Sequence, residues 1–478
     1  MAALVAGAPP RVPAASDRAV GDRSIVVLPF DNLSPDPNDA YLADGLTEEL
    51  IADLSRVSAL RVIARNSSVA AHQRTKDLKE ISRILDVRYL LEGSVRRAGR
   101  QLRITAQLID GTTDAHMWAE KYGGTMDDVF EMQERISRSI VNELRARLTQ
   151  HEATERGAPV TDPETYELYL RAKHMLGESL MRIPEATLLL EEVMRRDPRF
   201  VPAYYTLGAP LVLFAFFNYI EPKSTWPRIQ ALADNALAAD PRSGQAHELL
   251  AAVATYRDWN WSEAKRLYER ATELEPGAGF DRFLYAFFLA FSGDVEGGLR
   301  SAQQGRRLDP LSIMGFLTES VMLVWAGDLG AALPLADRAI ELDPQFPEGY
   351  HIKGYVLLHK KDFAASARSL ERAVELSHRS AWPMAKLGCA LVGLGRRDEA
   401  RTLLDELERR AANEVTISAP AVATLHLHLG DHSEFYRWMS RGIDERDPFA
   451  LAVGGEGLFN PARHDPEFRN LLRRVGLA

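Results

Sequence analysis

The sequence predicts two joined architectures: a small α/β domain at the amino-terminal end, followed by an all-α solenoid of paired helices. Two observations predict the solenoid. Acid–proline pairs recur every 34 residues, at Glu275-Pro276, Asp309-Pro310 and Asp343-Pro344, and small residues recur at fixed offsets within each unit. A third observation predicts the α/β domain. Short β-branched runs alternate with segments of helical hydrophobic spacing over residues 24–148.

The positions inside each unit strengthen the prediction of paired helices. Small residues lie five and twelve places before Pro344, at Ala339 and Ala332, and the same offsets recur before Pro276. Small side chains let two helices approach closely, and a proline cannot continue the helix that precedes it. The pattern and its 34-residue period resemble the tetratricopeptide repeat, a helix–turn–helix unit that stacks into a superhelix.

The α/β pattern is clearest at its start. Ser24-Ile-Val-Val-Leu-Pro-Phe30 is a β-branched run that predicts a buried strand, and residues 41–54 carry leucine and isoleucine at helical spacing. The other expected elements are a strand over 60–64, a helix over 77–85, a hairpin of strands over 89–96 and 101–110, a strand over 116–122 and a helix over 129–148. The predicted order is β-α-β-α-β-β-β-α.

Several blocks of this region resemble the TolB-amino-terminal-like domain. They include Ile25-Val-Val-Leu-Pro-Phe-Asp-Asn-Leu-Ser34, Leu91-Glu-Gly-Ser-Val-Arg96 and His116-Met-Trp-Ala-Glu-Lys-Tyr122. The resemblance covers residues 24–148. In many bacterial proteins such a domain precedes tetratricopeptide repeats and stands behind a class III adenylate cyclase domain or a winged-helix DNA-binding domain. We identify neither of these in the sequence, so the resemblance implies the accessory half of such a signalling protein.

The composition is that of an ordinary folded protein. Of the 478 residues, 46% are hydrophobic and 26% are charged, and the formal net charge of −9 argues against a nucleic-acid-binding surface. The single cysteine, Cys389, excludes an intrachain disulfide framework. The longest apolar runs are shorter than the ~20 residues that a membrane helix needs, and residues 1–10 lack the basic start of a signal peptide. We therefore expect a cytoplasmic protein without a membrane span.

No catalytic constellation is found, so we expect a protein that is not an enzyme and has no cofactor. The sequence has neither a glycine-rich phosphate loop ending in Gly-Lys-Ser/Thr nor a Gly-x-Ser-x-Gly nucleophile motif. The best metal candidates are His426, His428 and His432. Residues two apart on a helix do not share a face, and Gly430-Asp431 predicts a helix end before His432. We expect these histidines to be ordinary inter-helix residues, with no metal site.

Polar residues of the α/β domain lie at strand ends and in adjoining loops, where many α/β folds bind ligands. The candidate ligand-binding residues are Asp31, Asn32, Asp44, Glu48 and Arg65. The alternative is capping, because Asp31 and Asn32 are good turn formers and Glu48 is an acid in a first helical turn. A ligand site at these residues rests on analogy of fold alone.

The first helix of each repeat is expected to line a concave groove. By the 34-residue register, its inward-facing residues are Phe283, Phe287, Leu317, Val321, His351, Tyr355, Ala385 and Cys389. This strip is apolar and partly aromatic, unlike the Lys/Asn pattern of repeats that hold a C-terminal carboxylate. It predicts a groove for an extended or helical hydrophobic peptide of a partner protein. Two alternatives stay open: the strip packs on the chain's own α/β domain, or it is core because the register is displaced by a residue.

The predicted organisation is a disordered Ala/Pro-rich leader over 1–23, an α/β domain over 24–150, a repeat array over 160–448 and a C-terminal capping segment over 449–478. Within the array, we expect a long loop over 218–227 and a degenerate unit over 420–447. The predicted function is a non-enzymatic scaffold that binds a partner protein or peptide in the groove. The alternative is a regulatory or sensory subunit whose α/β domain binds a ligand and acts on a class III adenylate cyclase or a transcription regulator.

Overall fold

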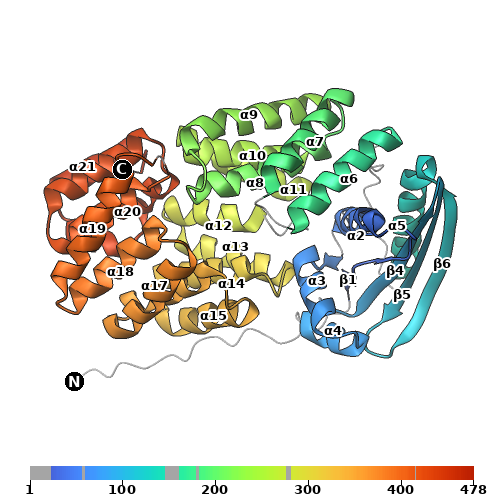
Figure 1. Ribbon diagram of the computed structural model, residues 1–478, viewed down its shortest axis with the longest axis horizontal. Helices are drawn as coiled ribbons and strands as arrows, with labels where there is room; N and C mark the ends of the chain where they lie inside the picture. The colour runs from blue at the N-terminus through green and yellow to red at the C-terminus, as the bar shows by residue number, and fades with distance from the viewer. Residues whose placement is uncertain are drawn as a thin grey trace, which may run out of the picture.

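In the computed structural model, a mixed β-sheet with helices on both faces is followed by a curved array of helix pairs (Figure 1). The predicted fold class is therefore confirmed. The structure describes residues 23–55, 57, 60–145, 161–178, 182–275, 281–414 and 416–477. The expected leader up to residue 22, the end of the helix expected over 129–148, and Pro276 lie outside these ranges.

The sheet has the strand order β3-β1-β4-β5-β6, and β2 pairs with β4. β1 runs parallel to both β3 and β4, whereas β4, β5 and β6 form an antiparallel meander. The strands are β1 (Ser24–Val27), β2 (Asp31–Asn32), β3 (Arg61–Val62), β4 (Tyr89–Ala98), β5 (Gln101–Asp110) and β6 (Ala115–Thr125). The expected hairpin is present, and Gly99 in its turn has a φ of 62°, which glycine adopts without steric cost.

Helices cover both faces of the sheet because the residues of β1 alternate in direction. Ile25 and Val27 face the core shared with α2 and α5, whereas Val26 faces the smaller core beneath α3 and α4. The helices are α2 (Ala40–Ser55), α3 (Arg65–Arg74), α4 (Leu78–Leu85) and α5 (Val129–Arg145), with short turns η1 (Pro37–Asp39) and η2 (Met126–Asp128). Helix α3 was not predicted from the sequence, because its residues show no apolar stripe of helical period.

The array consists of antiparallel helix pairs that pack on their neighbours. The first three pairs are α6 (Pro163–Glu178) with α7 (Ile183–Arg196), α8 (Pro202–Phe216) with α9 (Pro222–Ala239), and α10 (Gly244–Val253) with α11 (Trp261–Leu274), where η4 (Ala254–Asp258) continues α10. The next three are α12 (Asp281–Phe291) with α13 (Val295–Leu308), α14 (Ile313–Ala326) with α15 (Leu329–Leu342), and α16 (Pro347–His359) with α17 (Phe363–Leu376). The last two are α18 (Ala381–Gly393) with α19 (Arg397–Ala411), and α20 (Ala419–Leu429) with α21 (His432–Asp444). Within the described ranges, no helix is both long and apolar enough to cross a bilayer.

The turn inside several pairs is built in the same way. Gly327 and Gly430 end the first helices α14 and α20 in the left-handed region, at φ 85° and 88°. The aspartates that follow, Asp328 and Asp431, cap the second helices by accepting a hydrogen bond from a backbone N–H of the first turn. A glycine end and an aspartate start satisfy backbone groups that the helices leave unpaired.

The prediction of a long loop over 218–227 is wrong. Helix α9 begins at Pro222 and contains Pro227, so the connection from α8 is short. Proline is tolerated in the first turn of a helix, where its missing N–H has no partner to lose, so Pro222 did not exclude a helix start. Pro227 lies inside the helix, where it removes one backbone hydrogen bond. The degenerate unit expected over 420–447 is the helix pair α20–α21.

The α/β domain contacts the array at two separate places. Helix α2 packs along α6, and the start of α3 meets the connection between α13 and α14 (Figure 1). At the second contact, the Ser67 N–H donates to Asp309 Oδ1 at 3.1 Å, the Ser67 hydroxyl also donates to Asp309, and the Leu311 N–H donates to Ser67 Oγ at 2.7 Å. The Ala64 N–H donates to the Leu308 carbonyl at 2.9 Å.

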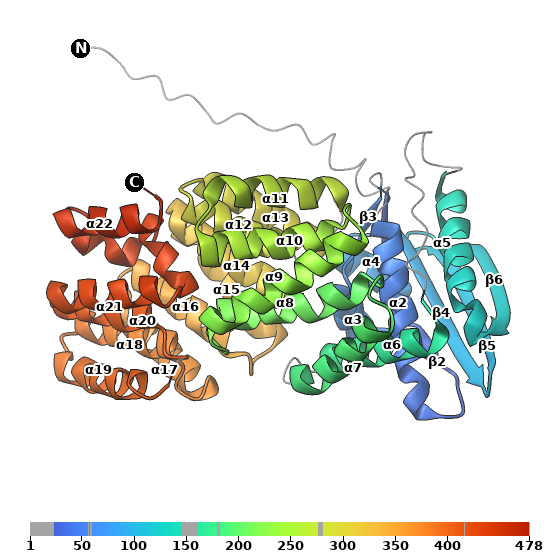
Figure 2. The same ribbon diagram turned by 90° about the horizontal axis from the view of Figure 1, so that it is seen from above.

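The C-terminal segment runs back across the array instead of ending at its last pair. It consists of η5 (Pro448–Gly454), η6 (Gly457–Ala462) and α22 (Pro466–Arg474). η5 lies against α8, η4 and α12, and α22 packs on α21 at the end away from the sheet (Figure 2). The Trp261 Nε1–H donates to the Val475 carbonyl at 2.8 Å, and the Arg446 guanidinium lies 3.7 Å from the centre of the Trp259 ring.

Ser67→Ala should destabilise the folded chain, because it leaves the Leu311 N–H without its acceptor and removes the hydroxyl bond to Asp309. We expect a loss of about 1–3 kcal/mol in the free energy of unfolding, measured by urea denaturation. Ser262→Ala, at an exposed hydroxyl bonded to Asn260, is the matched control. Equal stability of the two variants would show that the contact between α3 and the array contributes little.

Candidate ligand-binding cavity

A cavity of about 260 Å³ lies on the concave side of the array. The first helices α8, α12, α14, α16 and α18 form most of its wall, and the C-terminal segment adds Phe449, Ala452 and Glu456. The aromatic lining consists of Phe216, Phe217, Tyr219, Phe283, Phe287, Phe291, Trp325, Tyr355, Trp382 and Phe449. Tyr219 is 50% exposed, so it lies at the rim.

Six of the residues predicted to face the groove line this one cavity. They are Phe283, Phe287, Leu317, Val321, His351 and Tyr355. The 34-residue register therefore identified the concave side over three successive helices. The next helix, α18, differs: Ala385 and Cys389 are buried outside the lining, while Trp382 and Lys386 reach the cavity. Among the described residues, those that line the cavity all come from the array and the C-terminal segment, which covers part of the strip.

Sequence reasoning missed four charged residues of the lining, Glu348, Lys386, Arg410 and Glu456, and Lys386 is the one that lies over the aromatic rings. It is the sole charged residue of α18, within the run Ala-Trp-Pro-Met-Ala-Lys-Leu-Gly-Cys, and this isolation in an apolar helix was the available signal. Its ammonium lies 3.9 Å from the centre of the Tyr355 ring and 5.3 Å from that of Trp382. The side chain is only 7% exposed, and this burial lowers the pKa of Lys386 to about 8.

Glu456 from the C-terminal segment lies in the same wall but already has donors for both oxygens. Oε2 accepts the Tyr355 hydroxyl at 2.7 Å, and Oε1 accepts the Leu458 N–H at 2.9 Å and lies 3.3 Å from His359 Nε2. Burial alone would raise the pKa of Glu456, but the contact with His359, the charge of Lys386 and the Leu458 N–H together lower it to about 2. Glu456 is therefore a carboxylate at neutral pH.

Two further nitrogen atoms of the cavity wall are buried without a hydrogen-bond partner. These are His351 Nε2 and Trp382 Nε1. Burial, and then the charge of Lys386, holds the pKa of His351 well below its usual range, so the imidazole is neutral. At the rim, Tyr219 donates to Glu348 Oε1 at 2.7 Å, and burial raises the pKa of Glu348. The lining thus combines apolar walls with buried polar atoms that lack a recorded partner, among them the acceptor Glu348 Oε2.

The five candidate residues of the α/β domain are not brought together as one set. Arg65 pairs with Asp44 at 3.4 Å and with Glu48 at 3.0 Å, and the Lys173 ammonium of α6 lies 2.9 Å from Glu48. Both pairs of Arg65 lie within the domain, and the pair of Glu48 with Lys173 joins the domain to the first repeat. Asp31 and Asn32 lie on β2, where the Asn32 side chain accepts the Ser34 N–H at 3.0 Å. Ligand binding by these residues stays a prediction.

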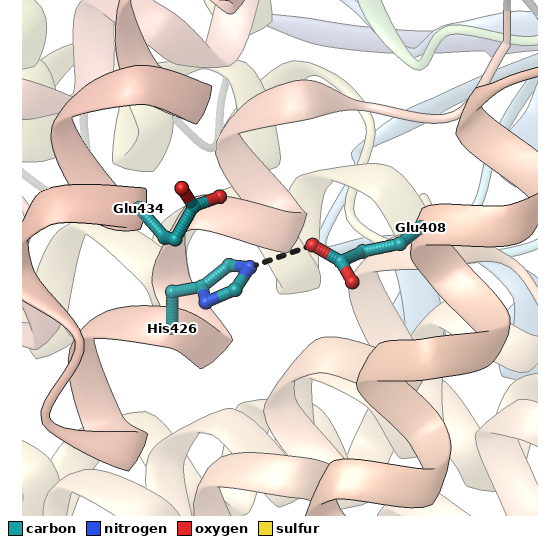
Figure 3. Close-up of side chains that lie close together, drawn as sticks. All are labelled: Glu408, His426 and Glu434. Carbon is teal, nitrogen blue, oxygen red and sulfur yellow. Dashed lines mark hydrogen bonds and ion pairs between the residues drawn. The ribbon is translucent and has the colours of Figure 1, made fainter.

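The three histidines of α20 and α21 contact different partners. His428 Nε2 lies 3.2 Å from the Leu458 carbonyl, and His432 Nδ1 lies 2.9 Å from Asp465 Oδ2. His426 Nε2 lies 3.0 Å from Glu408 Oε1, and Glu434 approaches the same imidazole (Figure 3).

The ligand atoms of Glu408, His426 and Glu434 all lie within 4.8 Å of one another, so this trio could hold a metal ion. Glu434 already accepts a hydrogen bond from Arg437 Nε at 2.7 Å, and Arg437 lowers the pKa of Glu434. The three side chains come from α19, α20 and α21, so their contacts hold two neighbouring pairs together. The absence of a metal site stays a prediction.

Comparisons with known proteins support the repeats. Residues 323–381 match the family model described as tetratricopeptide repeat, which confirms the repeat type predicted from the 34-residue period. A protein of Rhizobium meliloti (strain 1021) named putative adenylate cyclase 3 is 42% identical over 257 residues. That match covers 53% of this chain and 42% of the relative, so the chain spans less than half of that protein's length. The TolB-like assignment of the α/β domain stays a prediction.

Solved structures show only distant similarity. The APC/C hetero-tetramer Cut9-Hcn1 gives a TM-score of 0.45 at 15% identity, covering 72% of this chain and 59% of that chain. Pseudomonas aeruginosa pilF gives 0.36 at 16%, with coverage of 47% and 96%. YrrB, described as a TPR protein with an unusual peptide-binding site, gives 0.29 at 17%, with coverage of 39% and 91%. TM-scores this low support no conclusion about function.

Glu456→Gln should destabilise the protein at neutral pH and lose that effect in acid. A carboxylate whose pKa is lowered from 4.5 to about 2 adds stability above pH 4.5, and this stability is lost as the pH falls toward 2. We expect a deficit on the order of 2–3 kcal/mol at pH 7 that shrinks between pH 4.5 and 3, measured by urea unfolding. Glu185→Gln, at an exposed position of α7, is the control. A deficit independent of pH would contradict the assignment of charge to Glu456.

Proposed function

We propose that the chain is a non-catalytic scaffold whose repeat array binds a protein partner by taking an apolar side chain of that partner into the cavity. The cavity itself carries the proposal. Protein interiors are packed so closely that few voids exceed the size of a water molecule, yet about 260 Å³ stays open between the aromatic walls. Large apolar concavities with a few polar groups are the usual binding sites of proteins.

The contact that we propose is smaller than the bound peptide expected from the sequence. A groove for a whole extended or helical peptide requires a continuous open strip along the concave side. Here Phe449 and Ala452 of the C-terminal segment occupy part of that side. Phe287 is 8% exposed and Tyr355 is 1% exposed, so neither offers a broad surface. A single inserted side chain, with flanking contacts at the rim near Tyr219, fits the remaining space.

The proposal is tested by a photo-cross-linking amino acid placed at Val321, which is partly buried in the lining, and in parallel at Leu188, which is 70% exposed on α7. In the cells that produce the chain, a partner should cross-link through position 321 and not through 188. The identified partner is then purified and its affinity measured by calorimetry. We expect Val321→Trp, which fills the cavity, to weaken binding about tenfold or more, and Leu188→Trp to leave it unchanged.

The outcome that contradicts the proposal is a partner that binds Val321→Trp as tightly as the original chain. In that case the partner contacts another surface. Circular dichroism of both tryptophan variants controls for loss of the fold.

The relative named putative adenylate cyclase 3 favours a second candidate function, that of a regulatory region acting on a nucleotide cyclase. The α/β domain is joined to the array through the ion pair of Glu48 with Lys173 and the Ser67–Asp309 contact, and a change in the domain would reach the array through these contacts. We expect the purified chain to form no cyclic AMP from ATP and Mg²⁺, and to alter the rate when added to the part of the relative that this chain does not match. Cyclic AMP formed by the chain alone would make it an enzyme.

A further inference from the structure

We propose that the cavity is also a binding site for a small carboxylic acid, whose apolar body lies between the aromatic walls and whose carboxylate contacts the ammonium of Lys386. The proposal concerns the chain by itself and does not depend on partner binding. It follows from the charge of the cavity, its unpartnered donors and its size.

The buried ammonium of Lys386 is the first observation. Among the described residues, its recorded contacts are the rings of Tyr355 and Trp382, and it takes part in no ion pair or hydrogen bond that the structure records. A charged group that is 7% exposed is costly to bury unless it is paired. The obvious internal partner, Glu456, is held by Tyr355, His359 and the Leu458 N–H instead. The charge of Glu456 raises the pKa of Lys386 from a distance, but the structure records no direct ion pair between them, so an anion in the cavity would give the ammonium a direct partner.

The neighbouring donors are the second observation. Trp382 Nε1 carries a hydrogen and lacks an acceptor, and His351 Nε2 can donate in the tautomer that has its proton there. Both residues line the cavity together with Lys386. A carboxylate has two oxygens and about four acceptor positions, so it can accept from several of these groups at once. A neutral ligand with one weak acceptor would leave some of them unsatisfied.

The same contacts argue against a cationic ligand, although aromatic boxes commonly bind cations. The face of Tyr355 is already covered by the ammonium of Lys386 at 3.9 Å. A second cation would be repelled by Lys386 in surroundings of low polarity, where charges interact more strongly than in water. The aromatic residues away from Lys386, such as Phe283 and Phe287, then serve as the apolar wall.

The size of the cavity limits the ligand. A dry cavity of about 150 Å³ holds benzene, so a cavity of about 260 Å³ has room for about ten non-hydrogen atoms. A short aryl-alkanoic acid has this size, whereas a peptide backbone with several side chains does not. The free acid is therefore the occupant that we propose, rather than the end of a polypeptide.

The experiment uses the full chain and three probes that differ in one group: 3-phenylpropionate, 3-phenylpropan-1-ol and 3-phenylpropylamine. Isothermal titration should show that the acid binds about tenfold or more tightly than the alcohol, because a charged hydrogen bond is stronger than a neutral one, and that the amine binds weakest. Lys386→Met keeps an apolar side chain of similar length and should abolish the preference for the acid, with the alcohol bound as before. Lys353→Met, at a lysine of α16 paired with Asp337 outside the lining, should keep the preference.

The pH gives an independent readout of the same contact. Because burial lowers the pKa of Lys386 to about 8, the affinity for the acid should fall as the pH rises through 8, while the affinity for the alcohol should stay constant. The titratable groups around Lys386 are Glu456 from the C-terminal segment, His351 and Tyr355 from α16, and Cys389 on α18. Glu456 stays charged and His351 stays neutral across this range. Burial raises the pKa of Tyr355 and of Cys389, so neither carries the change near pH 8.

The proposal is overturned if the alcohol binds as tightly as the acid, if the preference survives Lys386→Met, or if the acid does not bind at millimolar concentration. If Lys386→Met does not fold, Trp382→Phe removes one donor and keeps the ring, and unchanged affinity for the acid would then count against the proposal. A peptide ending in phenylalanine that binds more tightly than the free acid also overturns it, since the occupant is then a partner's terminus. A failure here leaves the cross-linking test at Val321 unaffected.

Discussion

A helix pair of this array buries only the faces that it shares with its neighbours, and the concave side stays apolar until something covers it. The chain covers it with its own C-terminal segment. Phe449 and Ala452 lie against the aromatic residues of α8, α12 and α18, and the contact of Trp261 with Val475 holds the end of the segment in place. This return of the chain turns an open groove into a partly covered cavity, and the proposed function depends on that shape.

Two charged groups of the cavity, Lys386 and Glu456, are buried although burial disfavours charge. Lys386 and Glu456 have opposite charges and lie in the same wall, yet the carboxylate is satisfied by Tyr355 and His359. Buried charges seldom add stability when apolar residues could replace them, so their retention points to a task other than folding. A cavity that holds a positive charge among aromatic rings discriminates between ligands by their charge as well as by their shape.

The period of the sequence predicted the concave side well because it is a local property. Each unit repeats the same spacing of small residues and prolines, and so Phe283, Leu317 and His351 fall in equivalent places. The same extrapolation failed on α18, where Trp382 and Lys386 take the place of Ala385 and Cys389. A shift within one helix is set by packing against the neighbouring elements, which the period does not contain.

Contacts between distant parts of the chain left no comparable signal. Nothing in the spacing of residues 448–474 indicates that this stretch meets α8 and α12, because the pairing depends on the curvature accumulated over the whole array. Helix α3 was missed for a related reason. Its residues have little helical amphipathicity, and its start is held by the Ser67 contact with Asp309 and by the bond from the Ala64 N–H to the Leu308 carbonyl.

The two long-range contacts together have a mechanical consequence. In an open solenoid each unit contacts only its neighbours, so units can unfold one at a time from either end. Here the amino-terminal domain is hydrogen-bonded to the middle of the array at Asp309. The C-terminal segment is hydrogen-bonded to the middle of the array at Trp261. We expect these two contacts to couple the ends of the array to its middle units, so that the chain unfolds more cooperatively than an open solenoid does.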